Sequence, residues 1–409
     1  MKLQVKNFGP IRDGYTDRNG WLEFSRVNAI IGPQGSGKST IAKLLGTFLW
    51  LEKQLVRGYL TPNYIKLYNR FRKKYCAYQN MDNYFNDDTI LAFQGDSFTF
   101  EYVNEQININ KVNNGYYAMP KIMYIPAERN LASIIDRPDK LKGIPGALGT
   151  FIDEYERAKI STDKNLMLPI SGFYIRIDKA NRIIHVGSDS HSVRLSDSAS
   201  GFQSLVPLYL VSKMLGEEIE EGKDLKQSQL SAQEKIRLQN EIEKIMLDTN
   251  ISEEVRQATL RTISMRHKCE SFINIVEEPE LNLFPDTQKQ VLNELLRLCN
   301  LGKYNVIVFT THSPYLISYL ANTIKANDLG VKAIASGMNN KINLVSEIVP
   351  QSAWIKKEEC RIYYLSNSGD IKQLDTIGGI PSDDNYLNNA LAKSNIDFSN
   401  LLEIEQQWQ

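Results

Sequence analysis

A glycine-rich stretch, GPQGSGKST at residues 32–40, limits the possible folds of this chain more than any other segment. It follows an apolar run at residues 27–31, which predicts a buried strand. Ile41, Leu44 and Leu45 come next with helical spacing, so the stretch is predicted to lie between a strand and a helix. A strand, a glycine loop and a helix in this order form a unit of α/β proteins that can bind phosphate.

The spacing G-x-x-x-x-G-K-[ST] is satisfied by Gly32, Gly37, Lys38 and Ser39. Glycine permits backbone conformations that turn successive amides toward phosphate oxygens, and the helix dipole adds positive potential there. We therefore expect Lys38 to bridge the β- and γ-phosphates of ATP and Ser39 to bind Mg²⁺. A chance glycine turn is the alternative, and the flanking strand and helix argue against it. The residues predicted to bind ATP here are Gly32, Pro33, Gln34, Gly35, Ser36, Gly37, Lys38, Ser39 and Thr40.

Two adjacent carboxylates, Glu277 and Glu278, follow the apolar run FINIV at residues 272–276. Such a pair at the end of a buried strand is costly unless a cation lies near it, and Mg²⁺ held by a nucleotide would supply that charge. We expect Glu277 to bind Mg²⁺ and Glu278 to orient and deprotonate the attacking water. Read alone, the pair could form an exposed turn.

His312 follows a further apolar run, VIVF at residues 306–309. A histidine at a strand end is more often structural than catalytic. Its place in the chain, after the phosphate loop and the carboxylate pair, favours a contact with the γ-phosphate or the attacking water. We therefore treat Glu278 and His312 as the candidate catalytic residues.

A third polar segment, SDSASGFQS, leads into a helical apolar pattern that includes Phe202 and Leu205. We predict that Ser200 caps this helix next to Gly201, so that the helix end could bind an anion. Pro207 is expected to kink the helix. Standing alone, a segment of this kind would indicate only a helix cap.

Apolar runs and helical patterns alternate along the chain, which predicts an α/β fold. We expect a mixed, largely parallel central sheet, an antiparallel β lobe and a helical insertion. FYIRID and RIIHV are predicted to form a hairpin, and RIYYL is the one clear strand candidate in the C-terminal part. The predicted segments are 1–55 with the phosphate loop, 56–120 as an inserted lobe, 121–215 with the hairpin and the Ser200 helix, 216–262 as a helical insertion, 263–340 with the carboxylate pair and His312, and 341–409 as a C-terminal extension.

Composition argues against several functional classes. Lysine plus arginine equals aspartate plus glutamate at 48 each, so no overall positive field favours nonspecific binding to nucleic acid or anionic membranes. The four cysteines are widely spaced, which argues against a disulfide framework or a zinc site and indicates a reducing compartment. No apolar run resembles a signal peptide or a bilayer span, so we expect a cytoplasmic protein without membrane contact.

In this order the motifs resemble the ABC-type, AAA-family ATPases, and within them the branch of SMC proteins, RecF and the overcoming-lysogenization-defect (OLD) ATPases. The resemblance runs from the first strand to His312. KNFGPI followed by AIIGPQGSGKS is similar to the opening of that branch, and EEPELNLFP is similar to its magnesium motif and D-loop. ASGFQ stands in the place of the LSGGQ signature; it keeps Ser200, Gly201 and Gln203 and has Phe202 for the second glycine.

The resemblance implies an ABC-type ATPase head whose ATP sites form between two copies of the chain. Ser200, Gly201 and Gln203 would contact ATP held by the phosphate loop of the partner copy, in a homodimer or a higher homo-oligomer. ATP and Mg²⁺ would be the cofactors, and hydrolysis would be slow and regulatory. The turn IPAER takes the place of the Q-loop without a glutamine, and Glu128 is the candidate residue there.

The chain also resembles the ATPase subunits of bacterial anti-phage systems such as PARIS and Septu, which act with a separately encoded effector. OLD nucleases continue beyond the histidine motif into a TOPRIM domain. Here 97 residues follow His312, and Asp383 and Asp384 lack a preceding apolar strand. We therefore expect no nuclease in this chain, but an ATP-dependent assembly that gates a partner nuclease when a phage protein or DNA triggers it.

A RecF-like or SMC-like DNA-repair ATPase that binds DNA directly is the alternative. The basic patch at Arg70, Arg72, Lys73 and Lys74 supports it, and a solvated helix face explains that patch equally well. The ATPase subunit of a transporter fits poorly, because the inserted lobes and the EEPE sequence depart from such subunits.

Overall fold

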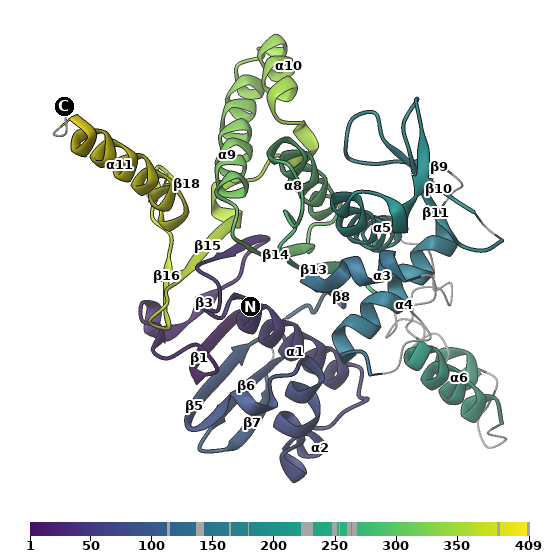
Figure 1. The fold of residues 1–409 in the computed structure, drawn as a ribbon. Coiled ribbons are helices and arrows are strands. Elements are labelled where there is room, and N and C mark those ends of the chain that lie inside the picture. The colour runs from purple at the N-terminus through teal and green to yellow at the C-terminus, as the bar shows by residue number, and fades with distance from the viewer. Residues whose placement is uncertain are drawn as a thin grey trace.

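A seven-stranded sheet forms the centre of the molecule, between two layers that cover its faces (Figure 1). In spatial order its strands are β2 (Gly14–Tyr15), β16 (Asp370–Gln373), β15 (Cys360–Leu365), β4 (Val27–Ile31), β14 (Val306–Thr311), β13 (Ser271–Glu277) and β8 (Pro120–Ile125). The five strands from β15 to β8 are parallel to one another. The computed structural model describes residues 1–112, 115–135, 143–162, 165–178, 180–221, 232–247, 252, 254–259, 263, 268–382 and 385–406.

The parallel strands are buried on both faces, which explains their continuous apolar sequences. Every residue of β4 and of β13 is buried. Side chains alternate between two hydrophobic cores, with Ala29 and Phe309 in one core and Ile30 and Val308 in the other. The predicted α/β fold with a mixed, largely parallel central sheet is therefore confirmed.

Helices cover the face of the sheet toward which Ala29 points. Leu208 of α5 and Leu292 of α8 lie in this core with Leu316 of α9, and burying each such leucine contributes about 1.5–3 kcal/mol. The shorter α3 packs on α5, and α10 packs on α9. The helices of this layer are α3 (Leu131–Ile134), α4 (Gly146–Ser161), α5 (Ser200–Glu220), α8 (Pro285–Asn300), α9 (Pro314–Ala335) and α10 (Asn339–Ile348).

The opposite face is covered by α1 (Lys38–Val56) and by a second, antiparallel sheet. Phe48 of α1 stacks on Phe93, with ring centroids 5.4 Å apart, and so ties the helix to that sheet. The predicted inserted lobe is continuous with the N-terminus here, because β5 pairs with β1. This sheet contains β3 (Leu22–Glu23), β1 (Lys2–Phe8), β5 (Phe85–Gln94), β6 (Phe98–Val103) and β7 (Gln106–Lys111), and α2 (Pro62–Lys66) packs on β7.

The predicted hairpin is present as β10 (Tyr174–Ile177) and β11 (Ile184–Gly187), which pair antiparallel. The strands β9 (Asn165–Met167) and β12 (Ser192–Arg194) extend it to a four-stranded sheet. A helix also forms in the charge-dense region, α6 (Ala232–Leu247). The predicted apolar stripe of α6 is half-buried and consists of Leu238, Ile242 and Ile245.

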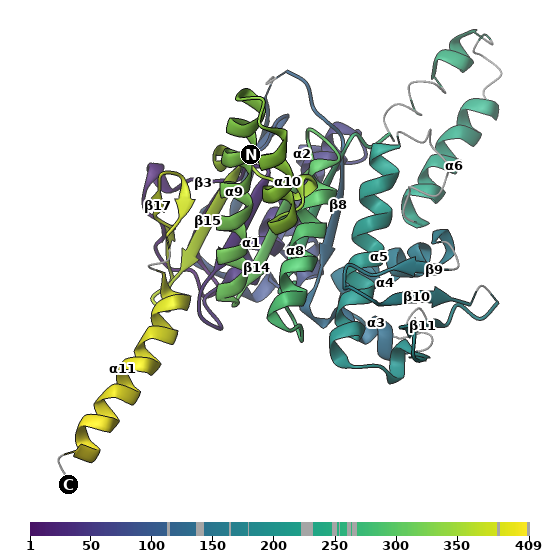
Figure 2. The same ribbon diagram turned by 90° about the horizontal axis from the view of Figure 1, so that it is seen from above.

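The C-terminal part contributes to the central sheet, although the sequence analysis set it apart as an extension. RIYYL forms most of β15, which pairs with β4, and the unpredicted β16 follows it. A small hairpin of β17 (Thr376–Ile377) and β18 (Ile380–Pro381) leads to α11 (Tyr386–Gln406), which extends away from the body in Figure 2. Asp383 and Asp384 lie outside the described residues.

The cysteines and the helices bear on two expectations from composition. All four cysteines are free, as predicted, and each is buried: Cys76, Cys269, Cys299 and Cys360. Within the described ranges, none of the helices combines the length and the apolar character that crossing a bilayer requires.

Candidate functional site

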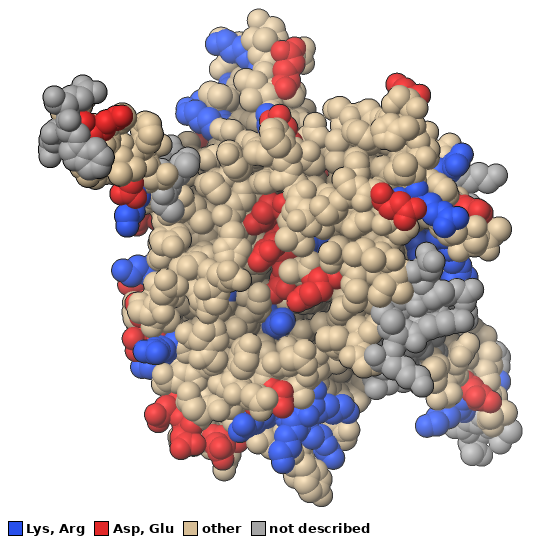
Figure 3. All heavy atoms as spheres, viewed as in Figure 1, with Lys and Arg blue, Asp and Glu red and all other residues tan. Residues whose placement is uncertain are grey.

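The predicted motifs meet at one edge of the central sheet. β4, β14, β13 and β8 are parallel neighbours, so the segments that follow them emerge side by side. The glycine loop follows β4, His312 follows β14, Glu277 and Glu278 lie at the end of β13, and a turn at Ala127 follows β8. Figure 3 shows acidic side chains gathered in the middle of the face that is viewed in Figure 1.

Two glycines of the loop are required by its geometry. Gly37 precedes α1 with a φ of 101°, in the left-handed region that favours glycine. A Cβ atom on Gly32 would lie 2.3 Å from the carbonyl oxygen of Leu365, the last residue of β15. The loop therefore lies directly against the C-terminal strand, a contact that sequence spacing did not indicate.

Lys38 is buried at the start of α1, with 6% of its surface exposed. Its Nζ donates hydrogen bonds to the carbonyl oxygens of Gly32 at 3.0 Å and Pro33 at 2.8 Å. Burial lowers the pKa of Lys38 to about 8, although the negative charge of Glu278 opposes the shift. Ser39 beside it is exposed, so the loop presents a hydroxyl next to the buried ammonium group.

Glu277 is a buried carboxylate with an unpaired oxygen. Only 4% of its surface is exposed, and its Oε2 accepts a hydrogen bond from the amide of Ala127 at 3.3 Å. Its Oε1 has no hydrogen-bond partner among the described residues. A buried, unpaired carboxylate oxygen is costly without a cation, so this atom fits the predicted metal ligand.

Glu278 and His312 form a pair across the ends of β13 and β14. The Nε2 of His312 lies 3.5 Å from Oε1 of Glu278, and both side chains are about one-third exposed. The hydrogen bond from His312 is the main cause that lowers the pKa of Glu278. The backbone of Glu278 has a φ of 43°, and its amide donates to the carbonyl oxygen of Thr310 at 3.0 Å.

Glu280 belongs to the site, although the sequence analysis assigned it no role. It is half-buried, and its Oε1 accepts hydrogen bonds from the hydroxyl of Thr311 and the amide of His312, both at 2.7 Å. Burial raises the pKa of Glu280. The last glutamate of EEPE thus fixes the backbone of the histidine that pairs with Glu278.

The start of α5 differs from the prediction. Ala199 occupies the cap position and makes no side-chain cap bond, and Ser200 is the first helical residue, so the predicted serine cap is wrong. Ser200 is exposed. A Cβ atom on Gly201 would lie 2.8 Å from the carbonyl oxygen of Asn282, so this glycine allows α5 to approach the D-loop.

Gln203 holds the segment that leads into α5. Its Nε2 donates to the carbonyl oxygens of Ser196 at 2.8 Å and Ser198 at 2.9 Å. These bonds occupy the side-chain amide that was predicted to bind ATP. The helix continues through Pro207 as far as Glu220.

Lys38 and Ser200 begin helices that lie on opposite faces of the central sheet. α1 contributes to one hydrophobic core, and α5 to the other (Figure 1). Among the described residues, the phosphate loop makes no hydrogen bond to Ser200 or Gly201.

In the turn after β8, the buried residue is Arg129, which follows the predicted Q-loop candidate Glu128. Glu128 is exposed, whereas Arg129 has 0% of its surface exposed and donates to the backbone carbonyl oxygens of Glu277 and Glu278. Sequence reasoning overlooked Arg129, because only the pairing of β8 with β13 brings it to the carboxylates.

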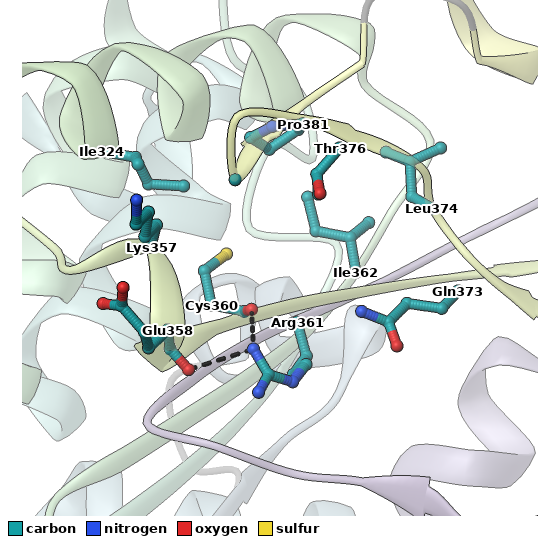
Figure 4. Close-up of a pocket in the computed structure, with 11 residues that line it drawn as sticks. Ile324, Lys357, Glu358, Cys360, Arg361, Ile362, Gln373, Leu374, Thr376 and Pro381 are labelled. Carbon is teal, nitrogen blue, oxygen red and sulfur yellow. Dashed lines mark hydrogen bonds between the residues drawn. The ribbon is translucent and has the colours of Figure 1, made fainter. Parts of the chain in front are cut away.

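A separate pocket of about 300 Å³ lies at the other end of the sheet (Figure 4). Cys360 lines it at the start of β15, level with Val27 at the start of β4. The guanidinium of Arg361 donates to the carbonyl oxygens of Glu358 at 3.0 Å and Cys360 at 2.8 Å. The pocket is therefore remote from the glycine loop, and its arginine is engaged by backbone.

Comparisons with solved structures give weak matches. The SMC head domain from Thermotoga maritima is 14% identical, with 78% of this chain and 90% of that chain covered and a TM-score of 0.32. An SMC head bound to the C-winged helix domain of ScpA is 12% identical, with coverage of 78% and 90% and a TM-score of 0.33. A dimeric ATP-binding cassette in a post-hydrolysis state, bound to ADP and phosphate, is 12% identical, with coverage of 92% and 100% and a TM-score of 0.26.

Curated proteins yield no match to the chain. The sequence model of the AAA ATPase domain matches residues 1–317, which include the glycine loop, both carboxylates and His312. The match covers most of the 409 residues. The chain therefore belongs to the AAA ATPase domain family.

Proposed function

We propose that this protein binds ATP with Mg²⁺ in its glycine loop and hydrolyses it slowly. The observation that carries the proposal is the convergence of Lys38, Glu277 and Glu278 at one edge of the sheet. A buried ammonium group, the buried carboxylate of Glu277 and the partly exposed carboxylate of Glu278 beside an open loop complement a triphosphate and a divalent cation. Gln34 and Gly35 are exposed, so their loop is accessible to a ligand.

The residues present suit the metal as well as the nucleotide. The hydroxyl of Ser39 and Oε1 of Glu277 would hold Mg²⁺, since the first is exposed and the second has no partner among the described residues. When bound, the ion supplies positive charge that stabilises the charge developing on the transferred phosphoryl group.

Glu278 is the candidate base and His312 its partner. The carboxylate of Glu278 is ionised at neutral pH, because its pKa is lowered from the ordinary value of a glutamate, so it can accept a proton from water. The contact with Nε2 of His312 at 3.5 Å orients the carboxylate, and Glu280 in turn holds the backbone of His312. Both catalytic side chains are partly exposed, so water can reach them.

Each ATP is further proposed to lie between two copies of the chain. The support is the separation of Lys38 and Ser200 on opposite faces of the sheet, together with the exposure of Ser200. One chain then offers the glycine loop and its partner offers the start of α5, in a homodimer or a higher homo-oligomer.

Phosphate release from ATP tests the catalytic proposal. The wild type is expected to release phosphate only when Mg²⁺ is present, at a rate that saturates with ATP. Lys38→Ala should reduce release to background, because it removes the cation that contacts the phosphates. Wild-type protein that binds no ATP in calorimetry would contradict the proposal.

In its biological role, the ATP-bound assembly is proposed to hold a separate effector, a nuclease, that a phage protein or DNA releases. The support is the resemblance of ASGFQ and EEPE to those of OLD-like anti-phage ATPases, which is an analogy. Coexpression with the product of the neighbouring gene, followed by size-exclusion chromatography, tests it. Failure to form a complex with ATP, with ADP and without nucleotide would count against this role.

Direct DNA binding is the second candidate, and a basic cluster favours it. Arg70, Arg72, Lys73 and Lys74 follow α2, and basic atoms gather at the lower edge of the face in Figure 3, where α2 lies in Figure 1. The guanidinium of Arg70 lies 3.9 Å from the ring centre of Tyr64. If the cluster binds phosphates, affinity for duplex DNA should fall steeply with salt, and Lys73→Ala should reduce the slope. Weak binding that salt does not alter would exclude this candidate.

A further inference from the structure

Arg129 is an arginine inside the protein, and its hydrogen-bond partners among the described residues are all backbone carbonyl groups. It lies in the turn after β8 and has 0% of its surface exposed. Its Nε donates to the carbonyl oxygen of Ser204 at 3.0 Å, and one terminal nitrogen donates to those of Pro126 at 3.2 Å and Glu277 at 2.6 Å. The other terminal nitrogen donates to the carbonyl oxygen of Glu278 at 2.6 Å. A guanidinium, with donors in a fixed fork, can reach these separate segments at once.

Two of these partners belong to Glu277, the candidate metal ligand, and Glu278, the candidate base. Glu278 has a φ of 43°, a conformation that is unfavourable for a residue with a side chain and persists only when its surroundings enforce it. Hydrogen bonds hold Glu278 on both sides. Its carbonyl oxygen accepts a bond from Arg129, and its amide donates a bond to the carbonyl oxygen of Thr310. Arg129 therefore helps to enforce the backbone from which the Glu278 carboxylate projects.

The remaining long-range partner, Ser204, lies in the first turns of α5. A second bond joins the same regions, because Nδ2 of Asn282 in the D-loop donates to the hydroxyl of Ser204 at 3.2 Å. Next to it, the hydroxyl of Ser133 donates to the carbonyl oxygen of Gln203 at 2.8 Å. The carboxylate segment and the start of α5 are thus joined through buried and partly buried hydrogen bonds, and Arg129 is the one described residue that bonds to both.

We propose that Arg129 is a positioning residue, which sets the backbone of Glu277 and Glu278 relative to the start of α5. The inference rests on the proposed ATPase function, since it concerns the geometry of the proposed base and metal ligand. Within the described part of the chain, Arg129 makes no hydrogen bond to the phosphate loop or to the side chains that would hold the nucleotide. Its loss should therefore impair turnover while leaving the affinity for ATP intact, and it should loosen the carboxylate segment and α5 together.

Arg129→Lys tests this, with Arg157→Lys as the matched control. Arg157 on α4 is also a largely buried arginine, and it pairs with Glu154 at 2.7 Å and Glu218 at 2.9 Å, away from the carboxylate pair. We expect Arg129→Lys to lower kcat about 100-fold, because a displacement near 1 Å can cost that much, and to change the Kd for ATP less than about threefold. Arg157→Lys should change kcat less than about threefold.

Amide hydrogen exchange supplies a readout that does not depend on hydrolysis. Exchange in residues 277–283 and 200–205 should rise in Arg129→Lys and stay at the wild-type level in Arg157→Lys. If the wild type hydrolyses no ATP, the proposed function fails and exchange still decides the role of Arg129. Equal exchange in the two variants, or an equal kcat with an active wild type, would overturn the inference.

Asn282→Gly provides a second variant in case Arg129→Lys does not fold. Asn282 has a φ of 61°, which glycine also adopts, so this change removes the bond to Ser204 and keeps the backbone conformation. We expect kcat to fall about tenfold, as one hydrogen bond of about 1.5 kcal/mol is lost, with unchanged ATP affinity. Wild-type kcat and wild-type exchange in this variant, with Arg129→Lys unfolded, would also overturn the inference.

Discussion

Lys38 is a charged side chain inside the protein. Its surroundings indicate that the glycine loop suits an anionic ligand. Its ammonium group donates to two loop carbonyl oxygens at 3.0 and 2.8 Å and faces the negative charges of three glutamates. Burial nevertheless lowers its pKa to about 8, because the charged form has lost solvent. A bound triphosphate would restore a counter-charge and favour the protonated form.

This pKa leads to a prediction for the pH dependence of ATP binding. Protonated Lys38 attracts phosphate and the neutral amine does not, so affinity should be constant below the pKa and fall as pH rises through about 8. The limiting slope is about tenfold per pH unit. Calorimetric Kd values between about pH 6.5 and about pH 9.5 measure it. Lys43→Ala, on the same helix, should retain the wild-type profile, and an affinity that rises above pH 8 would contradict the prediction.

Glu278→Gln should separate ATP binding from ATP hydrolysis. The amide is similar in shape to the carboxylate but cannot accept a proton from water, so kcat should fall about 10²–10⁴-fold. ATP affinity should remain, and the ATP-bound dimer should accumulate, because hydrolysis no longer releases it. Light scattering after size-exclusion chromatography measures the mass with ATP and with ADP. Glu101→Gln, exposed on β6, is the control, and a variant that hydrolyses ATP at the wild-type rate would remove Glu278 from its role.

Sequence spacing could predict the functional residues that lie next to one another in a recognisable motif. Lys38 is part of the glycine motif, and the Glu277–Glu278 pair follows an apolar run. Arg129 and Glu280 were not identified, because their roles depend on hydrogen bonds between strands that are distant in sequence. Ser200 was misplaced by one position, since Ala199 can occupy the cap without a side-chain bond.

At the scale of secondary structure, the central strands were the most predictable elements. β4, β13, β14 and β8 are buried on both faces, so their apolar runs stand out from the neighbouring sequence. β16 is short and carries polar residues, which gives no such signal. The pairing of β15 with β4 and of β5 with β1 is set by contacts distant in sequence, so segment boundaries drawn along the chain separated strands that share a sheet.

The approach of α5 to the D-loop gives a prediction at this scale. Gly201→Ala places a Cβ atom 2.8 Å from the carbonyl oxygen of Asn282, so α5 or the D-loop must shift. We expect the free energy of unfolding to fall by about 1–3 kcal/mol and ATPase activity to fall with it. Gly149→Ala on α4 is the matched control, because its Cβ meets nothing within 4 Å and the helix should gain up to about 1 kcal/mol. Denaturant unfolding of both variants measures the contrast, and equal stabilities would contradict it.

In the whole molecule, the two elements proposed to bind the nucleotide are divided between the faces of one sheet. α1 and the antiparallel sheet form one layer, and α5 with α8 and α9 forms the other. Lys38 and Ser200 therefore begin helices on opposite sides of β4 and its neighbours. Because of this division, the proposed assembly needs two chains to enclose one ATP.

Complementation between two inactive variants tests the shared site most directly. Lys38→Ala lacks a working phosphate loop, and Gly201→Ala displaces the start of α5, so each homodimer should be inactive. A mixed dimer holds one intact site, and an equal mixture should regain about one quarter of wild-type turnover, since half of the dimers are mixed. Phosphate release from the mixture, with mixed dimers verified by differential tagging, is the measurement. Activity at background in verified mixed dimers would contradict the shared site.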